Sequence, residues 1–219
     1  MKSIIAMIVP IFILSTLLLS SCNREIITPN KEATEYFPNK IGNYWEYDVY
    51  DSSQARGIPY SDYPRHYTVK VNITGIKKLV DGNDATVWEY EYPWGKELNY
   101  IRISGDTVKI YDTVYSTTVR NLEFPRELYI LPYQNNQTWN GKLLWVDKYS
   151  VNTVSSITTV WNTFTDCFLI FHHYEGPNIE SNDKYWFKPN VGLLKKYKHQ
   201  YNLAPLNIEL WQLKKYYLQ

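Results

Sequence analysis

The segment LNYIRISGDTVKIYDTV, residues 98–114, is the strongest local indication of the fold class. Its centre is Gly105-Asp106, a two-residue loop with glycine first, which is typical of the type II′ turn of a β-hairpin. This turn predicts the cross-strand pairs Ser104–Thr107, Ile103–Val108, Arg102–Lys109, Ile101–Ile110 and Tyr100–Tyr111. The aliphatic pairs share one face, which we expect to be buried. The opposite face carries Arg102 beside Lys109, so we expect it to be solvated.

Other segments repeat the two-residue period of a half-buried strand. Within residues 44–50, one face holds Trp45, Tyr47 and Val49, and the other holds acidic residues. The same criterion predicts strands at residues 66–74, 85–92, 143–150, 154–161, 166–175, 184–188, 193–199 and 208–217. The last of these segments also fits the apolar stripe of a helix, and we predict a strand there.

Together these segments predict a mostly β fold, namely a curved antiparallel sheet, a sandwich or a partial barrel of about ten strands. The strands do not alternate with helical segments, and the chain has no glycine-rich phosphate loop. We expect residues 37–219 to form this single β-rich domain. Residues 185–197 weakly resemble residues 100–111 in their order of aromatic residues, glycine and lysine. This similarity is explained either by two similar halves of the sheet or by the general likeness of hairpins.

The composition narrows the class of partner. The 219 residues include 23 Lys and Arg against 22 Asp and Glu, which gives a net charge of +1. Proteins held to nucleic acid by charge are strongly basic, so we expect no nucleic-acid partner. Aromatic residues are abundant, with 21 Tyr, 8 Trp and 7 Phe, which again favours strands.

The first 22 residues carry a targeting signal. A short positive start is followed by an almost entirely apolar run at residues 4–19 and then by small residues. This order is typical of a secretory signal peptide, here residues 1–21. The sequence Leu19-Ser20-Ser21-Cys22 resembles the lipobox of bacterial lipoproteins. The resemblance implies cleavage before Cys22 and attachment of acyl chains such as palmitate to this residue, whereas an ordinary signal peptide would leave Cys22 unmodified.

Lipidation of Cys22 would make the membrane a partner of this protein, because two or more acyl chains hold a protein stably on a bilayer. The expected location is therefore the cell envelope. Asn23 after the lipidated residue resembles the class of lipoproteins sorted to the outer membrane. Residues 22–36 are polar, contain a proline and lack a clear period, so we expect them to be the lipidated cysteine and a flexible tether.

Three further motifs resemble those of a broad group of uncharacterised bacterial envelope lipoproteins. They are YFP at residues 36–38 with IGNYWEY at 41–47, TDCF at 165–168, and YWFKPNVGLLK at 185–195. The sequence WNTF at 161–164 departs from the Pro-Ala-Gly pattern that the group has before its second motif. The resemblance implies a mostly β domain with a curved antiparallel sheet. It implies no reaction, since no activity belongs to the group as a whole.

No catalytic or metal-binding signature is convincing. His172 and His173 are neighbours in a predicted strand, so they point to opposite faces and cannot bind one ion. Cys167 lies in an apolar strand, where a buried inert thiol is expected. Glu89 and Glu91 are roughly 6–7 Å apart on one face, near the separation in inverting glycosidases, but any solvated strand face with two Glu has this spacing, and we expect a solvated face. We therefore expect no catalytic residue, no metal and no cofactor.

Six aromatic residues in or beside Pro-, Gly- or Asn-rich connections are candidates for stacking on a ligand: Tyr60, Tyr63, Tyr92, Trp94, Tyr133 and Trp139. Exposed rings of this kind stack on sugars or accept an apolar partner. The alternative is that these rings pack over the ends of the β core.

The leading hypothesis is a lipid-anchored, non-enzymatic envelope protein that binds a small molecule, a glycan or a protein partner. The first alternative is a periplasmic carrier for a lipid or other apolar molecule, which requires an apolar cavity of roughly several hundred Å³. The second alternative is a hydrolase whose site is assembled from distant loops. It requires a concave site with carboxylates or histidines of shifted pKa.

Overall fold

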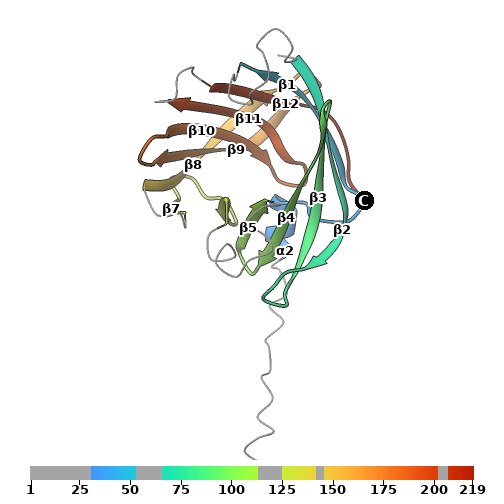
Figure 1. The fold of residues 1–219 in the computed structure, drawn as a ribbon. Coiled ribbons are helices and arrows are strands. Elements are labelled where there is room, and N and C mark those ends of the chain that lie inside the picture. Colours follow the sequence, from blue (N-terminus) through green and yellow to red (C-terminus); the bar gives the residue numbers. More distant parts are fainter. Residues whose placement is uncertain (1–30, 53–65, 113–124, 142–145, 202–206) are drawn as a thin grey trace, which may run out of the picture.

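The computed structural model describes residues 31–52, 66–112, 125–141, 146–201 and 207–219. These described residues form one short helix and one antiparallel sheet of twelve strands (Figure 1). The elements are α2 (Lys31–Tyr36), β1 (Tyr44–Asp51), β2 (His66–Lys78), β3 (Asp84–Tyr92), β4 (Gly95–Ser104), β5 (Thr107–Asp112), β6 (Glu127–Ile130), β7 (Thr138–Asn140), β8 (Val146–Thr158), β9 (Thr163–Glu175), β10 (Glu180–Lys188), β11 (Gly192–Tyr201) and β12 (Asn207–Tyr217). The predicted curved antiparallel sheet is confirmed, in its partial-barrel form.

The sheet consists of two meanders joined along one pair of strands. Strands β1 to β6 and strands β7 to β12 form two meanders, which meet where β1 pairs with β12. Within the described residues β6 and β7 are therefore the two edges, and Trp139 bridges them by donating its indole N–H to the Leu128 carbonyl at 2.9 Å. Figure 1 shows the sheet curling round on itself, with α2 tucked into its lower end.

Alternation of side chains gives the sheet one buried face. In β1, Trp45, Tyr47 and Val49 are all at most 4% exposed, as their shared face predicts, and they point into the curl of the sheet. The core continues through the inward residues of the other strands, including Val71, Tyr129, Tyr185 and Leu213. Burying such large side chains, at roughly 25 cal/mol per Å² of apolar surface, provides the main stabilising free energy of a fold with no internal disulfide in its described part.

The hairpin of β4 and β5 has all five predicted cross-strand pairs. Gly105 takes a φ of 59°, as the first central residue of a type II′ turn requires. The expectation of a solvated outer face was wrong in part. Tyr100 and Tyr111 are buried there in a second small cluster with Leu79 and Ala85, because the end of the β2–β3 hairpin packs over them.

Several boundaries differ from the sequence-based expectations. Strands were predicted at residues 143–150 and 154–161, but residues 146–158 form one long strand, β8, because its partner β9 continues unbroken alongside it. Residues 143–145 lie outside the described residues, and residues 159–161 are not part of a strand. The short edge strands β6 and β7 were not predicted. The segment 208–217 lies within strand β12 rather than in a helix.

The end of the expected tether is structured. Residues 31–36 form α2, and Ala33 is 1% exposed because it packs into the hydrophobic core with Phe37. Any flexible tether therefore ends before residue 31. No helix in the described part of the chain is long and apolar enough to cross a membrane.

Candidate ligand-binding cavity

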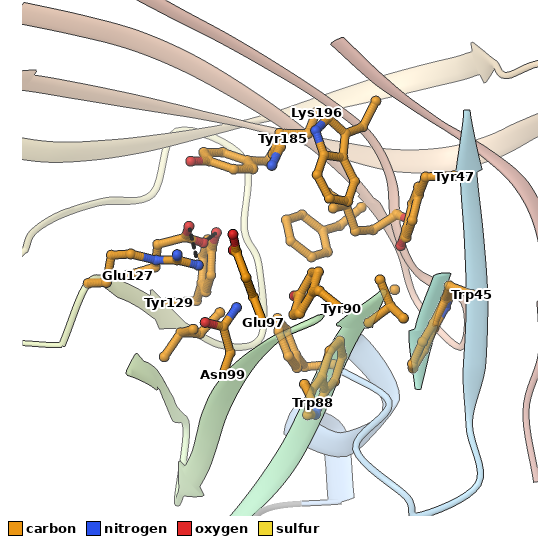
Figure 2. A pocket seen from close by; sticks show the side chains of 18 of the residues that line it. Trp45, Tyr47, Trp88, Tyr90, Glu97, Asn99, Glu127, Tyr129, Tyr185 and Lys196 are labelled. Atoms are coloured by element: carbon orange, nitrogen blue, oxygen red, sulfur yellow. Dashed lines mark hydrogen bonds and ion pairs between the residues drawn. The ribbon is translucent and has the colours of Figure 1, made fainter. Parts of the chain in front are cut away.

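The curled sheet encloses a cavity of about 210 Å³. Its wall comes from both meanders and from the segment after α2, so residues far apart in the sequence meet there. Figure 2 shows two regions of this wall: Trp45 and Trp88 lie to the right and below, whereas Glu127 and Lys196 lie to the left and above. We call the first region the aromatic floor (Phe37, Trp45, Trp88 and Phe187) and the second the charged wall (Arg126, Glu127, Lys196, Lys198 and Glu209).

The aromatic floor is rigidly held. Trp45 and Trp88 stack with ring centroids 5.0 Å apart, and Phe37 packs on Trp88 at 5.4 Å. Trp45 donates its indole N–H to the Val191 carbonyl at 2.8 Å, and Trp88 donates to the Asn39 side-chain oxygen at 2.7 Å. Because both N–H groups are satisfied within the protein, these two indoles contribute apolar ring surface to the floor.

The charged wall is a loose network of ion pairs. Glu127 lies 3.6 Å from the Arg126 guanidinium and 3.9 Å from Lys198 Nζ. Lys196 Nζ lies 3.4 Å from Glu209 and 3.8 Å from the centre of the Trp211 ring. Cross-strand pairing on β11 and β12 fixes this arrangement, because it sets Lys196 opposite Trp211 and Lys198 opposite Glu209. Glu97 is a further carboxylate on the cavity wall.

The pKa shifts indicate that the carboxylates of the charged wall are ionised at neutral pH. Burial alone would raise the pKa of Glu127, but Arg126 and Lys198 outweigh it and lower the pKa to about 2. The pKa of Glu209 is lowered in the same way, because Lys196 and Lys198 outweigh the effect of burial. Burial lowers the pKa of Lys196 to about 8, although Glu209 opposes the shift. Both carboxylates are therefore ionised at neutral pH, and Lys196 is the most readily discharged cation.

The predicted ligand-stacking aromatics lie in different places. Tyr60 and Tyr63 lie outside the described residues. Tyr92 lines the cavity, and Trp94 stacks on it at 5.1 Å with 38% of its surface exposed.

The other two candidates lie near the edges of the sheet. Tyr133 is 3% exposed and packs in the core against Tyr36, Phe168 and Phe187, so its ring is not available at the surface. Trp139 is half-buried and stacks on Tyr149 at 5.1 Å. Cys22, the predicted lipidation site, lies outside the described residues.

The charged wall was missed by the sequence analysis. One signal was available: Leu194, Lys196 and Lys198 alternate along one strand, so the two lysines share the face of a residue that is fully buried. Charged side chains on the inward face of a strand are costly unless they serve a site. Arg126 and Glu127 gave no such signal, because strand β6 is too short to show a period.

The candidate catalytic residues do not converge on this cavity. Glu89 forms an ion pair with Lys96 at 2.7 Å on the outer face, and Glu91 is exposed there. Cys167 is 1% exposed, as predicted, and burial raises the pKa of its thiol. In the described segments, no three His, Cys, Asp or Glu side chains are placed to hold a metal ion.

The two neighbouring histidines lie on opposite faces, as predicted. His173 is bonded to Asn182 at 2.9 Å, whereas His172 is buried between Asp147 and Asp183. His172 Nε2 lies 2.8 Å from Asp147, and its ring stacks on Tyr149 at 4.1 Å. Burial alone would lower the pKa of His172, but the two aspartates outweigh burial and raise it.

Comparisons with known proteins add only distant similarities. No protein-family model matches the chain, and no curated protein matches its sequence. One similar solved structure is a "putative exported protein with YmcC-like fold" from Bacteroides fragilis, with 15% identity and a TM-score of 0.43. Another is a "putative lipoprotein" from Parabacteroides distasonis, with 14% identity and a TM-score of 0.38. Each alignment covers 83% of this chain and 98% of the other. The interpretation of the cavity therefore rests on the structure of this chain alone.

Proposed function

We propose that this protein is a lipid-anchored, non-enzymatic protein of the bacterial cell envelope that binds a small amphipathic molecule inside its sheet. The observation that carries the proposal is the cavity of about 210 Å³ between the aromatic floor and the charged wall. A protein that needed only a stable core would fill this space with apolar side chains, because ionised groups at inward positions are costly.

The composition of the wall favours an amphipathic ligand over a purely apolar one. A carrier for a lipid or hydrocarbon would present an apolar surface throughout, whereas five ionised side chains form one side of this cavity. The volume is also below the roughly 300–1,000 Å³ of sites for drug-sized ligands. The ligand is therefore smaller than a typical membrane lipid and has both an apolar and a polar part.

The chemistry of the cavity favours binding over catalysis. A hydrolase needs a group that can give up or accept a proton near neutral pH. Glu127 and Glu209 are held ionised by neighbouring cations, with the pKa of Glu127 lowered to about 2, so neither is suited to act as a general acid. Lys196, with a pKa of about 8, does titrate near neutral pH, but its ammonium group lies 3.4 Å from Glu209 and 3.8 Å from the centre of the Trp211 ring, which favour the charged form that binds an anion. The tyrosines on the wall are no better suited, because burial raises the pKa of Tyr129 and Tyr185 well above the usual value.

The proposed location rests on the N-terminal sequence. The lipobox-like sequence at residues 19–22 and the similarity of the motifs at 36–47 and 185–195 to those of envelope lipoproteins support lipid anchoring. Asn23 supports the outer membrane as the specific destination. A small-molecule binder on a tether would act close to the membrane surface, where it could capture molecules that cross the envelope.

Native mass spectrometry of residues 23–219, purified from a bacterial periplasm, tests the proposal. We expect a bound mass that disappears on denaturation and that identifies the ligand. The matched control replaces Trp88, which forms part of the floor, with alanine and should lose the bound mass. A mass equal to that of the protein alone, in a preparation that also fails to bind small amphipathic molecules added afterwards, would contradict the proposal.

A further inference from the structure

We propose that the ligand is an organic anion: a small aromatic body that carries one carboxylate or a similar acidic group, with the acidic group held by Arg126, Lys196 and Lys198. This inference rests on the proposed function, since it names the chemical class that the same cavity accepts. It follows from an imbalance in the charged wall between hydrogen-bond donors and acceptors.

The acceptors of the charged wall are already engaged within the protein. Glu127 Oε2 accepts a hydrogen bond from the Tyr129 hydroxyl at 2.6 Å, and its other oxygen faces two cations. Glu209 Oε1 accepts from the Trp211 indole N–H and also faces Lys196. A ligand that offered further donors would therefore compete with protein groups for both oxygens of Glu127 and for Oε1 of Glu209.

The donors are held much more loosely. The closest carboxylate oxygens to Arg126 and Lys198 are 3.6 and 3.9 Å away among the described residues, which is longer than a hydrogen bond. A guanidinium has five N–H donors and an ammonium has three, and in the described part of the chain none of those of Arg126 and Lys198 has a carboxylate oxygen at bonding distance. The Arg126 side chain is also 44% accessible to solvent. An incoming carboxylate would supply the missing acceptors, and charge-assisted hydrogen bonds of this kind are strong.

The pKa shifts of the two carboxylates agree with cations close by. Arg126 and Lys198 at Glu127, and Lys196 and Lys198 at Glu209, outweigh burial and lower both pKa values. The pKa of Lys196 is lowered chiefly by burial, with Lys198 and Arg126 adding to the shift and Glu209 and Glu127 opposing it. An anion bound beside Lys196 would favour its charged form and raise its pKa.

The aromatic floor sets the shape of the rest of the ligand. Trp45 and Trp88 stack on one another with an interplanar angle of 15°, and the Phe37 ring is tilted by 38° to Trp88 and by 34° to Phe187. Together these rings form an apolar, aromatic surface. An aromatic body packs on such rings by offset or edge-to-face contacts and loses less conformational entropy on binding than a flexible chain.

A set of three matched probes tests the proposal: 2-naphthoate, 2-naphthamide and 2-naphthylmethylamine. They share one flat body and differ in carrying a negative charge, no charge or a positive charge. Binding is measured by isothermal titration calorimetry on the full chain in phosphatidylcholine nanodiscs, with empty nanodiscs as the blank. We expect 2-naphthoate to bind at least about tenfold more tightly than the other two, since it alone forms charge-assisted hydrogen bonds with the cations.

Variants on strand β11 locate the anion. Lys198→Gln should weaken binding of 2-naphthoate by about tenfold and leave binding of 2-naphthamide unchanged. Lys195→Gln is the matched control, because Lys195 lies in the same strand on the opposite face, over the Trp186 ring, and should have no effect. Since Lys198 approaches Glu127 only at 3.9 Å, its removal should leave the fold intact, which circular dichroism checks.

The pH profile gives a second measurement. The charged or titratable groups near Lys196 are Glu209 from β12, Tyr185 from β10, Lys198 from β11, and Arg126 and Glu127 at the start of β6. Because the pKa of Lys196 is about 8, binding of 2-naphthoate should weaken as the pH rises from 6.5 to 9.5. Lys196→Met should bind 2-naphthoate more weakly and lose this pH step.

The outcomes separate the two proposals. Equal or tighter binding of the amide or the amine would overturn the anionic class while leaving the cavity as a binding site. Binding of 2-naphthoate that is insensitive to both Lys198→Gln and Lys196→Met would overturn the assignment of the anion to this wall. Failure of all three probes to bind, together with a ligand-free native mass, would overturn the proposed function itself.

Discussion

Two buried tyrosines, Tyr133 and Tyr129, differ in whether the hydroxyl group is hydrogen-bonded. The Tyr133 hydroxyl is buried and has no hydrogen-bond partner in the described structure. Leaving a buried polar group unsatisfied costs roughly 1–3 kcal/mol. Tyr133→Phe should therefore raise the free energy of unfolding, by up to about 1 kcal/mol, in urea denaturation.

Tyr129→Phe is the matched control for this prediction. Tyr129 is just as buried, but its hydroxyl donates to Glu127 at 2.6 Å, so its loss should lower the free energy of unfolding by about 1 kcal/mol or more. If both variants are destabilised equally, the Tyr133 hydroxyl must have a partner in solution. The printed sequence gives no means of telling these two tyrosines apart.

His172 should make stability depend on pH. Its folded pKa is raised above the ordinary value of 6.5 by Asp147 and Asp183, despite burial. A raised folded pKa means that the stabilisation is complete below the unfolded pKa and is lost as the pH rises through the folded pKa. We expect the stability difference between wild type and His172→Gln to be about 3 kcal/mol near pH 6 and to shrink as the pH rises above 6.5.

Urea denaturation of both proteins at intervals from pH 5.5 to 9 measures this difference. His173→Gln is the control, because His173 is bonded to the neutral amide of Asn182 rather than to a carboxylate. A difference between wild type and His172→Gln that stayed constant over this range would show that His172 keeps one protonation state throughout.

At some turns between strands the backbone takes a conformation that favours glycine. Gly192 at the start of β11 has a φ of 93°, in the region that favours glycine, and it lies beside Trp45 of the aromatic floor. Gly192→Ala should lower the free energy of unfolding by about 1–2 kcal/mol. Gly75→Ala is the matched control, because an added methyl group there meets nothing within 4 Å, so its effect should be small. Equal effects in thermal denaturation would exclude backbone strain as the cause.

The strands themselves could be predicted where side chains alternate strictly. The β4–β5 hairpin was predicted to the residue because its turn residues and its alternation agree. Strand β8 was predicted as two strands with a break at residues 151–153, whereas pairing with β9 keeps the chain extended through Val151, Asn152 and Thr153. Strands β6 and β7 are only four and three residues long, which is too short to show a side-chain period. They form the two edges of the sheet among the described residues.

The cavity belongs to the whole molecule and could not be predicted from local patterns. Arg126 lies just before β6 and Glu127 is its first residue, at the edge of one meander. Lys196 in β11 and Glu209 in β12 belong to the other meander. They meet only because β1 pairs with β12 and the sheet then curls. A local search for catalytic spacing considers only residues close in sequence, such as Glu89 and Glu91, so it could not find a site assembled across the sheet.

The proposed lipid anchor at Cys22 would hold the folded domain close to the membrane surface. Lys31, where α2 begins, is nine positions after Cys22 in the sequence, and a fully extended chain of that length spans at most about 30 Å. If acyl chains on Cys22 are the anchor, Cys22→Ser should move the protein from the membrane fraction to the soluble periplasmic fraction. Cys167→Ser is the matched control: the buried Cys167 lies inside the domain, so its variant should stay with the membrane. Retention of a correctly processed Cys22→Ser protein in the membrane fraction would contradict lipid anchoring, because it would show that the folded domain itself holds the bilayer.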